Sequence, residues 1–172
     1  MRRGESDVAA TIWQAESTVH VTQARALFLE YAQWLKVDLC FQGFDAELAG
    51  LPGDYAPPSG RLLLAGAHGI AFGCIALRPL DTAARSGEVK RLYVQPSQRG
   101  QRWGHRLGEA LIAEARAIGY RELKLDTLAW MTPARTLYSE LGFLECAPYY
   151  VNPLPDVVYM SLQLLPAGAS RR

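Results

Sequence analysis

The sequence predicts a single α/β domain in which helices flank one mixed sheet. A length of 172 residues fits one domain, since domains average roughly 150 residues. Apolar residues make up 49% of the chain and charged residues 20%, which is typical of soluble globular proteins. Strand-like and helix-like segments follow one another as strand, helices, three strands, helix, strand, helix and strand. This order indicates one sheet covered by helices.

The composition also excludes several classes of protein. The 18 basic and 17 acidic residues give a net charge of +1, whereas general nucleic-acid binders carry a large basic excess. The three cysteines are far apart and form no CxxC pair, which argues against a disulfide framework or a closed zinc site. The start MRRGESDVAATIW lacks the apolar stretch of a signal peptide, and no run reaches the ~18 apolar residues of a membrane span. We therefore expect a cytoplasmic protein without nucleic-acid or membrane partners.

The first third of the chain predicts a strand, a helix and a loop. Residues 1–10 and 167–172 are expected to be flexible termini around a domain at 11–166. A strand is predicted over 11–16 and a further helical turn over 44–48. Residues 51–60 contain several helix and strand breakers and predict a surface loop or a flap. Helical spacing of five apolar residues predicts a helix over 21–39: Leu27, Phe28, Tyr31, Trp34 and Leu35.

The rest of the chain alternates strands with helices. Two apolar runs at 61–67 and 70–80, separated by His68 and Gly69, predict a β-hairpin. Gly119 and Gly142 are placed to end two helices, the second of which begins with proline. The predicted elements are strands at 88–94, 122–128 and 157–164 and helices at 103–118 and 133–141.

The segment RGQRWG, residues 99–104, joins a predicted strand to a predicted helix. Its glycines let the backbone approach a ligand, and a helix N-terminus offers free N–H groups with partial positive charge. The pattern is therefore compatible with a phosphate site, or with an ordinary tight turn. It matches neither GxxxxGK[ST] nor GxGxxG, and no Lys-Ser/Thr pair follows, so a P-loop nucleotide-binding protein is set aside.

Three motifs in order resemble the GNAT acetyltransferase superfamily. RGQRWG resembles its Q/R-x-x-G-x-G/A pyrophosphate loop, and ARTLYSELGF at 134–143 resembles its A-x-x-LYExLGF motif. The ending PYYVNPLPDVVYMSL resembles the last hairpin of many bacterial members. The resemblance covers residues 12–164 and is strongest from Glu88 onward. One departure is Arg102, where the superfamily usually has glycine; its side chain either crowds the pyrophosphate or adds a cationic contact.

The resemblance implies a GNAT-like fold that binds acetyl-CoA without a metal. It implies a mostly antiparallel sheet of about six to seven strands with about four helices, splayed between the fourth and fifth strands. The backbone of Leu92, Tyr93 and Val94 would pair with the pantetheine chain like an added strand. The pyrophosphate would bind at the loop formed by Arg99, Gly100, Gln101, Arg102, Trp103 and Gly104.

The implied activity is N-acetyl transfer to a primary amine by direct attack in a ternary complex. Tyr138 matches the position of the superfamily's general acid, and a phenol with a pKa of about 10 is protonated at neutral pH. The spacing of Glu88 from Arg99 resembles that of the general base in the histone-acetylating branch. The alternatives are that Tyr138 only packs within its helix, that Glu88 is a solvated carboxylate at the start of a strand, and that the amine loses its proton to solvent through water. A backbone N–H near Tyr93 or Val94 would stabilise the oxyanion.

The acceptor is the least determined part of this hypothesis. Tyr149, Tyr150 and Asn152 precede the last strand, where they would line the acceptor cleft or fill the hairpin. The acceptor is expected to be a small-molecule amine or a peptide amine, and the resemblance is compatible with a homodimer. A non-catalytic acyl-CoA-binding sensor is the alternative: Arg102 favours it, while Tyr138 and Glu88 favour an enzyme.

Overall fold

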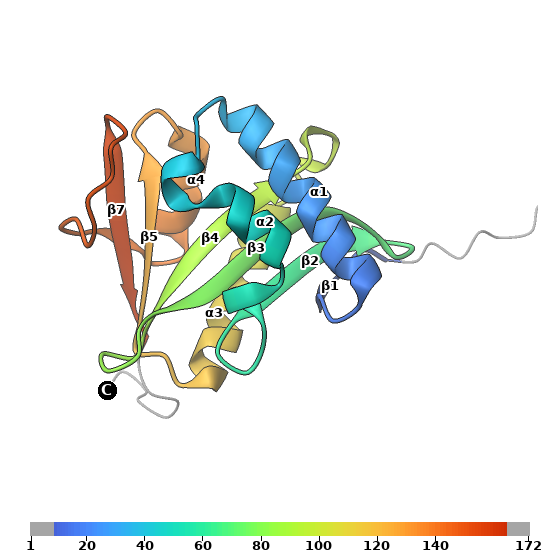
Figure 1. Cartoon of the computed structure of the whole chain (residues 1–172), viewed down its shortest axis with the longest axis horizontal. Helices are drawn as coiled ribbons and strands as arrows, with labels where there is room; N and C mark the ends of the chain where they lie inside the picture. Colours follow the sequence, from blue (N-terminus) through green and yellow to red (C-terminus); the bar gives the residue numbers. More distant parts are fainter. Residues whose placement is uncertain (1–8, 165–172) are drawn as a thin grey trace, which may run out of the picture.

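The computed structural model describes residues 9–164 (Figure 1). The termini that were expected to be flexible, 1–10 and 167–172, therefore lie outside the described residues except for Ala9 and Ala10. No helix in the described range is long and apolar enough to cross a membrane.

Seven strands form one sheet in the order β1-β2-β3-β4-β5-β7-β6. Every neighbouring pair is antiparallel except β4 and β5, which are parallel. This confirms the predicted mixed, mostly antiparallel sheet. The strands are β1 (Thr11–Gln14), β2 (Arg61–Ala67), β3 (Ile70–Asp81), β4 (Ser86–Val94), β5 (Glu122–Leu128), β6 (Leu144–Glu145) and β7 (Val157–Gln163).

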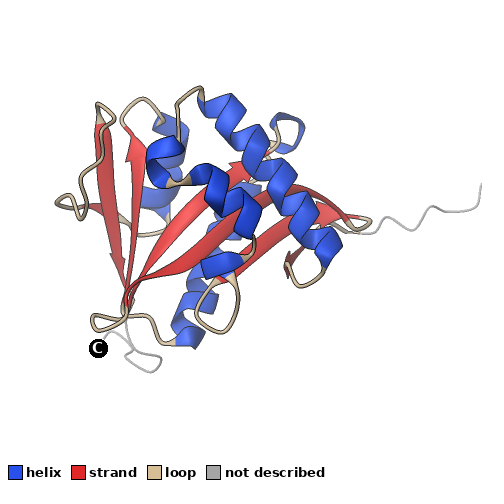
Figure 2. Cartoon of the chain, viewed as in Figure 1, coloured by secondary structure: helices blue, strands red, loops and turns tan. Residues whose placement is uncertain are grey.

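Helices cover both faces of the sheet, as Figure 2 shows. On one face lie α1 (Thr18–Leu35) and the short α2 (Phe44–Gly50); α3 (Trp103–Ile118) and α4 (Thr132–Glu140) lie on the other. Side chains alternate across each strand, so Leu62 and Leu64 pack beneath α1 while Leu63 packs beneath α3. The sheet thus separates two apolar cores.

The boundaries of α1 differ from the predicted helix at 21–39. The helix begins at Thr18 because the Ser17 hydroxyl accepts a hydrogen bond of 3.1 Å from the His20 N–H, a side-chain cap that satisfies an end group. It ends at Leu35, where Lys36 adopts a left-handed conformation usually occupied by glycine. A lysine at that position does not mark a helix end in the sequence, so the predicted helix extended past Leu35 to residue 39.

Short elements account for the remaining differences. The region predicted as a loop over 51–60 contains a 3₁₀ turn at Gly53–Tyr55, and a second turn lies at Cys40–Gln42. Strand β6 was not predicted, because two residues are too few to show an alternating pattern. The hairpin, the two glycine-terminated helices and the closing strand are confirmed.

Candidate active site

The site begins where β4 and β5 separate. The two strands pair over only three positions, from Ser86–Glu122 to Glu88–Lys124. Within the described residues no further β4–β5 pairing follows, so the rest of the β4 edge is left without a strand partner. This is the predicted splay between the fourth and fifth strands.

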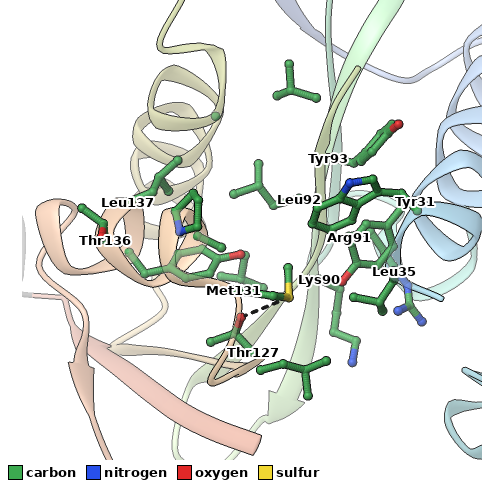
Figure 3. A pocket seen from close by; sticks show the side chains of 18 of the residues that line it. Tyr31, Leu35, Lys90, Arg91, Leu92, Tyr93, Thr127, Met131, Thr136 and Leu137 are labelled. Atoms are coloured by element: carbon green, nitrogen blue, oxygen red, sulfur yellow. Dashed lines mark hydrogen bonds between the residues drawn. The ribbon is translucent and has the colours of Figure 1, made fainter. Parts of the chain in front are cut away.

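A cavity of about 530 Å³ fills this gap. In Figure 3 the β4 residues face α4 across the cavity, and α1 closes the β4 side through Tyr31 and Leu35. The cavity runs from the loop after β4 to a polar end near Lys90. Its lining includes Gln98, Arg99, Gly100, Arg102, Trp103, Gly104 and His105 at the loop, Leu92, Tyr93, Val94 and Tyr138 along its length, and Gln42, Lys90, Asp126 and Leu154.

Strand β4 carries a bulge in the wall of this cavity. Arg91 and Leu92 together stand opposite a single residue of β3, between the pairs Ala76–Lys90 and Cys74–Tyr93. Arg91 has φ of 59°, a strained conformation for a residue with a side chain, and such strain costs roughly 1–3 kcal/mol. A bulge redirects backbone groups, and this one interrupts the ladder between β3 and β4 in the wall of the cavity.

Buried contacts hold the bulge in place. The Arg91 guanidinium, with 4% of its side chain exposed, donates to both carboxylate oxygens of Glu47 on α2, at 3.1 and 2.5 Å. Tyr55 donates to the same carboxylate, and the Cys74 thiol donates to the Arg91 carbonyl at 3.3 Å. Burial alone would raise the pKa of Glu47, but hydrogen bonds and charge from Arg91 hold it below its usual value.

The loop at 99–104 is built as the start of α3. Gly100 has φ of 80°, and Arg102 adopts the left-handed conformation with φ of 61° directly before the helix. The Arg102 side chain is 67% exposed at the cavity rim, and its Nη2 lies 3.9 Å from Glu140 Oε2. Packing also favours glycine at position 104, since a Cβ there would lie 2.8 Å from Leu137 Cδ1 of α4.

The other predicted loop residues have different surroundings. Arg99 folds back, donating from Nε to the Val94 carbonyl at 2.9 Å, and its guanidinium stacks on the rings of Trp34 and Tyr93. Trp103 is buried. Gln101 is exposed, donates to Gln98 and does not belong to the cavity lining.

Tyr138 of α4 lines the cavity opposite β4. Its ring packs edge-to-face on Phe143, with centroids 5.8 Å apart. Burial raises the pKa of its hydroxyl above the ordinary value of about 10, with a smaller contribution from Asp126. The phenol therefore keeps its proton at neutral pH, as a general acid requires.

Glu88 lies beside the cavity rather than in its lining. Its side chain is only 2% exposed and is ion-paired with Arg78, whose Nη2 lies 2.7 Å from Oε2. The Tyr149 hydroxyl donates to Oε1 at 2.9 Å. A proton would have to reach Glu88 through neighbouring groups.

Tyr149, Tyr150 and Asn152 gather around Glu88 and Asp126, outside the cavity lining. Asn152 donates to the Tyr150 hydroxyl at 2.7 Å and to Asp126 Oδ2 at 3.3 Å. Through Asn152 they therefore contact one lining residue, Asp126, without lining the cavity themselves.

The sequence reasoning missed several polar lining residues, among them Gln42, Lys90 and Asp126 at the polar end of the cavity. Lys90 could have been found, because residues two apart on a strand share a face and Glu88 was already a candidate. Burial lowers the pKa of Lys90, against the opposing charges of Glu88 and Asp126. Gln42 and Asp126 give no local signal. In residues 9–164, no group of three metal-ligating side chains is placed to hold an ion.

Comparison with known proteins points to one family. The family model described as Acetyltransferase (GNAT) family matches residues 19–143. An uncharacterized N-acetyltransferase of Schizosaccharomyces pombe is 43% identical over 141 residues, which cover 81% of this chain and 86% of that protein. An IAA acetyltransferase of Azospirillum brasilense is 40% identical over 94 residues, 55% of this chain and 61% of that protein.

Solved structures share the fold. A GNAT-family acetyltransferase from Staphylococcus aureus Mu50 superposes with a TM-score of 0.75 at 21% identity, covering 91% of this chain and all of that one. An acetyltransferase from Salmonella typhimurium, solved with its cofactor acetyl-CoA, gives a TM-score of 0.68 at 23% identity and covers 94% and 97% of the two chains.

Proposed function

Because the chain belongs to the GNAT acetyltransferase family, we propose that this acyltransferase takes its acetyl group from acetyl-CoA and transfers it to a primary amine by direct attack in a ternary complex. The observation that carries the proposal is the single cavity that joins the loop at 99–104 to Tyr138 along the unpaired edge of β4.

The residues present fit acetyl-CoA, which supplies a thioester as the acetyl donor. The edge of β4 at Leu92, Tyr93 and Val94 has no β5 partner and suits an extended amide-containing chain, which would compete with Arg99 Nε for the Val94 carbonyl. The N-terminus of α3 suits a pyrophosphate. Arg102 is exposed beside that helix start, so it is available to add a cationic contact. A backbone N–H close to the β4 bulge is suited to the negative charge that develops on the carbonyl oxygen.

Two proton transfers accompany the reaction. Tyr138 faces the cavity with its proton retained, which suits protonation of the departing sulfur. The amine must lose a proton before attack. Glu88 is the base that the resemblance implies, but Asp126 lines the cavity and is the better placed carboxylate for direct transfer. Lys90 Nζ lies 3.8 Å from Glu88 Oε1 and 3.8 Å from Asp126 Oδ1.

The test is isothermal titration with acetyl-CoA, followed by release of free thiol in the presence of an amine panel. Binding together with amine-dependent release is expected. Binding without release from any amine would favour the acyl-CoA sensor instead. Absence of binding would contradict the assignment of the cavity to acetyl-CoA. Gly104→Glu should abolish binding, because it places bulk and negative charge at the loop. Since Gly104 also packs against Leu137, circular dichroism of the variant must match that of the wild type.

A further inference from the structure

The polar end of the cavity carries one positive and one negative side chain that do not pair closely. Lys90 and Asp126 both line the cavity, with 6% and 13% of their side chains exposed. Lys90 Nζ lies 3.8 Å from Asp126 Oδ1, which is beyond the 2.7–3.2 Å range of an N–H···O hydrogen bond.

Within the described residues, the Lys90 ammonium has more N–H donors than hydrogen-bond acceptors. It carries three N–H groups, and within the described residues its hydrogen-bond partner is Gln42 Oε1 at 3.1 Å. Glu88 Oε1 lies 3.8 Å away. Buried donors without acceptors are costly, especially on a charged group. In Figure 3 Lys90 extends along the β4 side of the cavity, away from Tyr93.

The other charges nearby already have close partners. Glu88 is paired with Arg78 at 2.7 Å, and Glu47 is paired with both ends of the Arg91 guanidinium. Within the described residues, Lys90 and Asp126 form ion pairs only at 3.8 Å, so a ligand can engage these two charges without breaking a close ion pair. Asp126 Oδ2 accepts from Asn152, which leaves Oδ1 facing Lys90.

We propose, on the basis of the acetyltransferase function above, that the acceptor is a free α-amino acid with an apolar side chain. Its carboxylate would bind Lys90, and its amine would lie against Asp126. The two groups of an α-amino acid are attached to one carbon, which matches two opposite charges a few ångströms apart. Leu35, Leu39 and Leu154 line the same end and suit an apolar side chain.

The same charges disfavour other amines. A polyamine would bring a second positive charge beside Lys90, and a lysine side chain or protein N-terminus lacks a free carboxylate close to its amine. Unpaired buried charge is how a site rejects the wrong ligand.

The chemistry balances. The bound ammonium passes one proton to Asp126, which returns it to solvent, and the nitrogen lone pair forms the N–C bond to the acetyl carbonyl. As the C–S bond breaks, the sulfur takes a proton from Tyr138. Tyr138 is then restored by the second proton, which the nitrogen loses on becoming an amide.

The experiment compares amino acids with their decarboxylated counterparts. L-leucine, L-methionine and L-phenylalanine are assayed beside 3-methylbutylamine, 3-(methylthio)propylamine and 2-phenylethylamine, at saturating acetyl-CoA, by thiol release. A hydrogen-bonded charge pair predicts that kcat/KM for at least one amino acid exceeds that of its amine by about tenfold or more.

Variants then locate the preference. Lys90→Met should bring the ratio of amino acid to amine close to one, with acetyl-CoA affinity unchanged as evidence of an intact fold. Gln42→Leu, which retains the ammonium, should reduce the ratio only in part. Lys124→Met makes the same substitution on β5, at a lysine outside the cavity lining, and should leave the ratio unchanged.

The outcomes separate this inference from the proposed function. Thiol release with amines that equals or exceeds release with amino acids overturns the inference and leaves the acetyltransferase function standing. An amino-acid preference that survives Lys90→Met also overturns the assigned site. Absence of acetyl-CoA binding, or binding without release from any amine, overturns both.

Discussion

At the scale of single residues, Tyr138 carries the sharpest prediction. Tyr138→Phe keeps the ring and its contact with Phe143 but removes the proton donor from the cavity wall. A general acid contributes ~10²–10⁴-fold, so we expect kcat to fall at least about a hundredfold while the Kd for acetyl-CoA stays constant. Steady-state thiol release and isothermal titration measure the two quantities. An unchanged kcat would show that Tyr138 only packs.

The roles of Asp126 and Glu88, the two carboxylates beside Lys90, can be distinguished by substitution in the same way. Asp126→Asn removes the carboxylate that lines the cavity, whereas Glu88→Gln changes one that is ion-paired behind it. We expect the first to lower kcat/KM by about a hundredfold near neutral pH, with partial recovery at high pH as more amine is neutral in solution. We expect a smaller effect from the second. A pH–rate profile of each variant decides, and the reverse order of effects would assign the base to Glu88.

At the residue scale, the sequence could nominate site residues where they lie in one contiguous motif. The loop at 99–104 and Tyr138 were nominated in this way, and Tyr138 and all of the loop residues but Gln101 line the cavity. Lys90 could have been inferred from its spacing to Glu88 on the same strand. Gln42 and Asp126 could not, because the fold brings them to Lys90 from two other segments and no spacing in the sequence indicates that they meet.

At the scale of elements, the contact between α2 and β4 should stabilise the fold. Glu47→Gln leaves the buried Arg91 guanidinium without its charge partner, and breaking such a pair costs about 3–5 kcal/mol. Urea denaturation should therefore show a loss of about 3 kcal/mol at pH 7. Glu145→Gln breaks a more exposed ion pair, with Arg135, and should cost less than about 1 kcal/mol.

The same pair predicts a dependence on pH. The pKa of Glu47 in the folded protein lies below its ordinary value of about 4.3, because Arg91 outweighs the effect of burial. The stabilisation is thus fully present above that value and is lost as pH falls through the lowered pKa. The difference in unfolding free energy between the wild type and Glu47→Gln should shrink in that acidic range. A difference that stays constant down to pH 2 would contradict this account.

Elements were predictable to the extent that their ends carry a signal. Gly119 and Gly142 mark helix ends in the sequence and in the structure. Lys36 ends α1 in a left-handed conformation that a lysine in the sequence does not predict. The bulge at Arg91 is held by contacts from Glu47 of α2 and Cys74 of β3. Tertiary contacts fixed these features, so a reading of local patterns could not reach them.

At the scale of the whole molecule, the open edge of β4 predicts that acetyl-CoA stabilises the fold. A ligand that binds only the folded state at a hundredfold excess over its Kd contributes about 2.7 kcal/mol. For a domain of this size the thermal midpoint should rise by about 5–10 °C. Differential scanning fluorimetry measures the shift, and Gly104→Glu should show none. A shift retained by that variant would mean that the ligand binds elsewhere.

The three-position pairing of β4 with β5 also divides the sheet into two leaves that meet along a short spine. Strands β1 to β4 form one leaf, and β5, β7 and β6 form the other. Gly87 lies in the spine, where a methyl group would meet Leu77 Cδ1 of the first leaf at 2.9 Å and Leu123 Cδ2 of the second at 3.3 Å. A larger side chain at position 87 would therefore press on both leaves where they join, so the splayed sheet requires the smallest residue at this point.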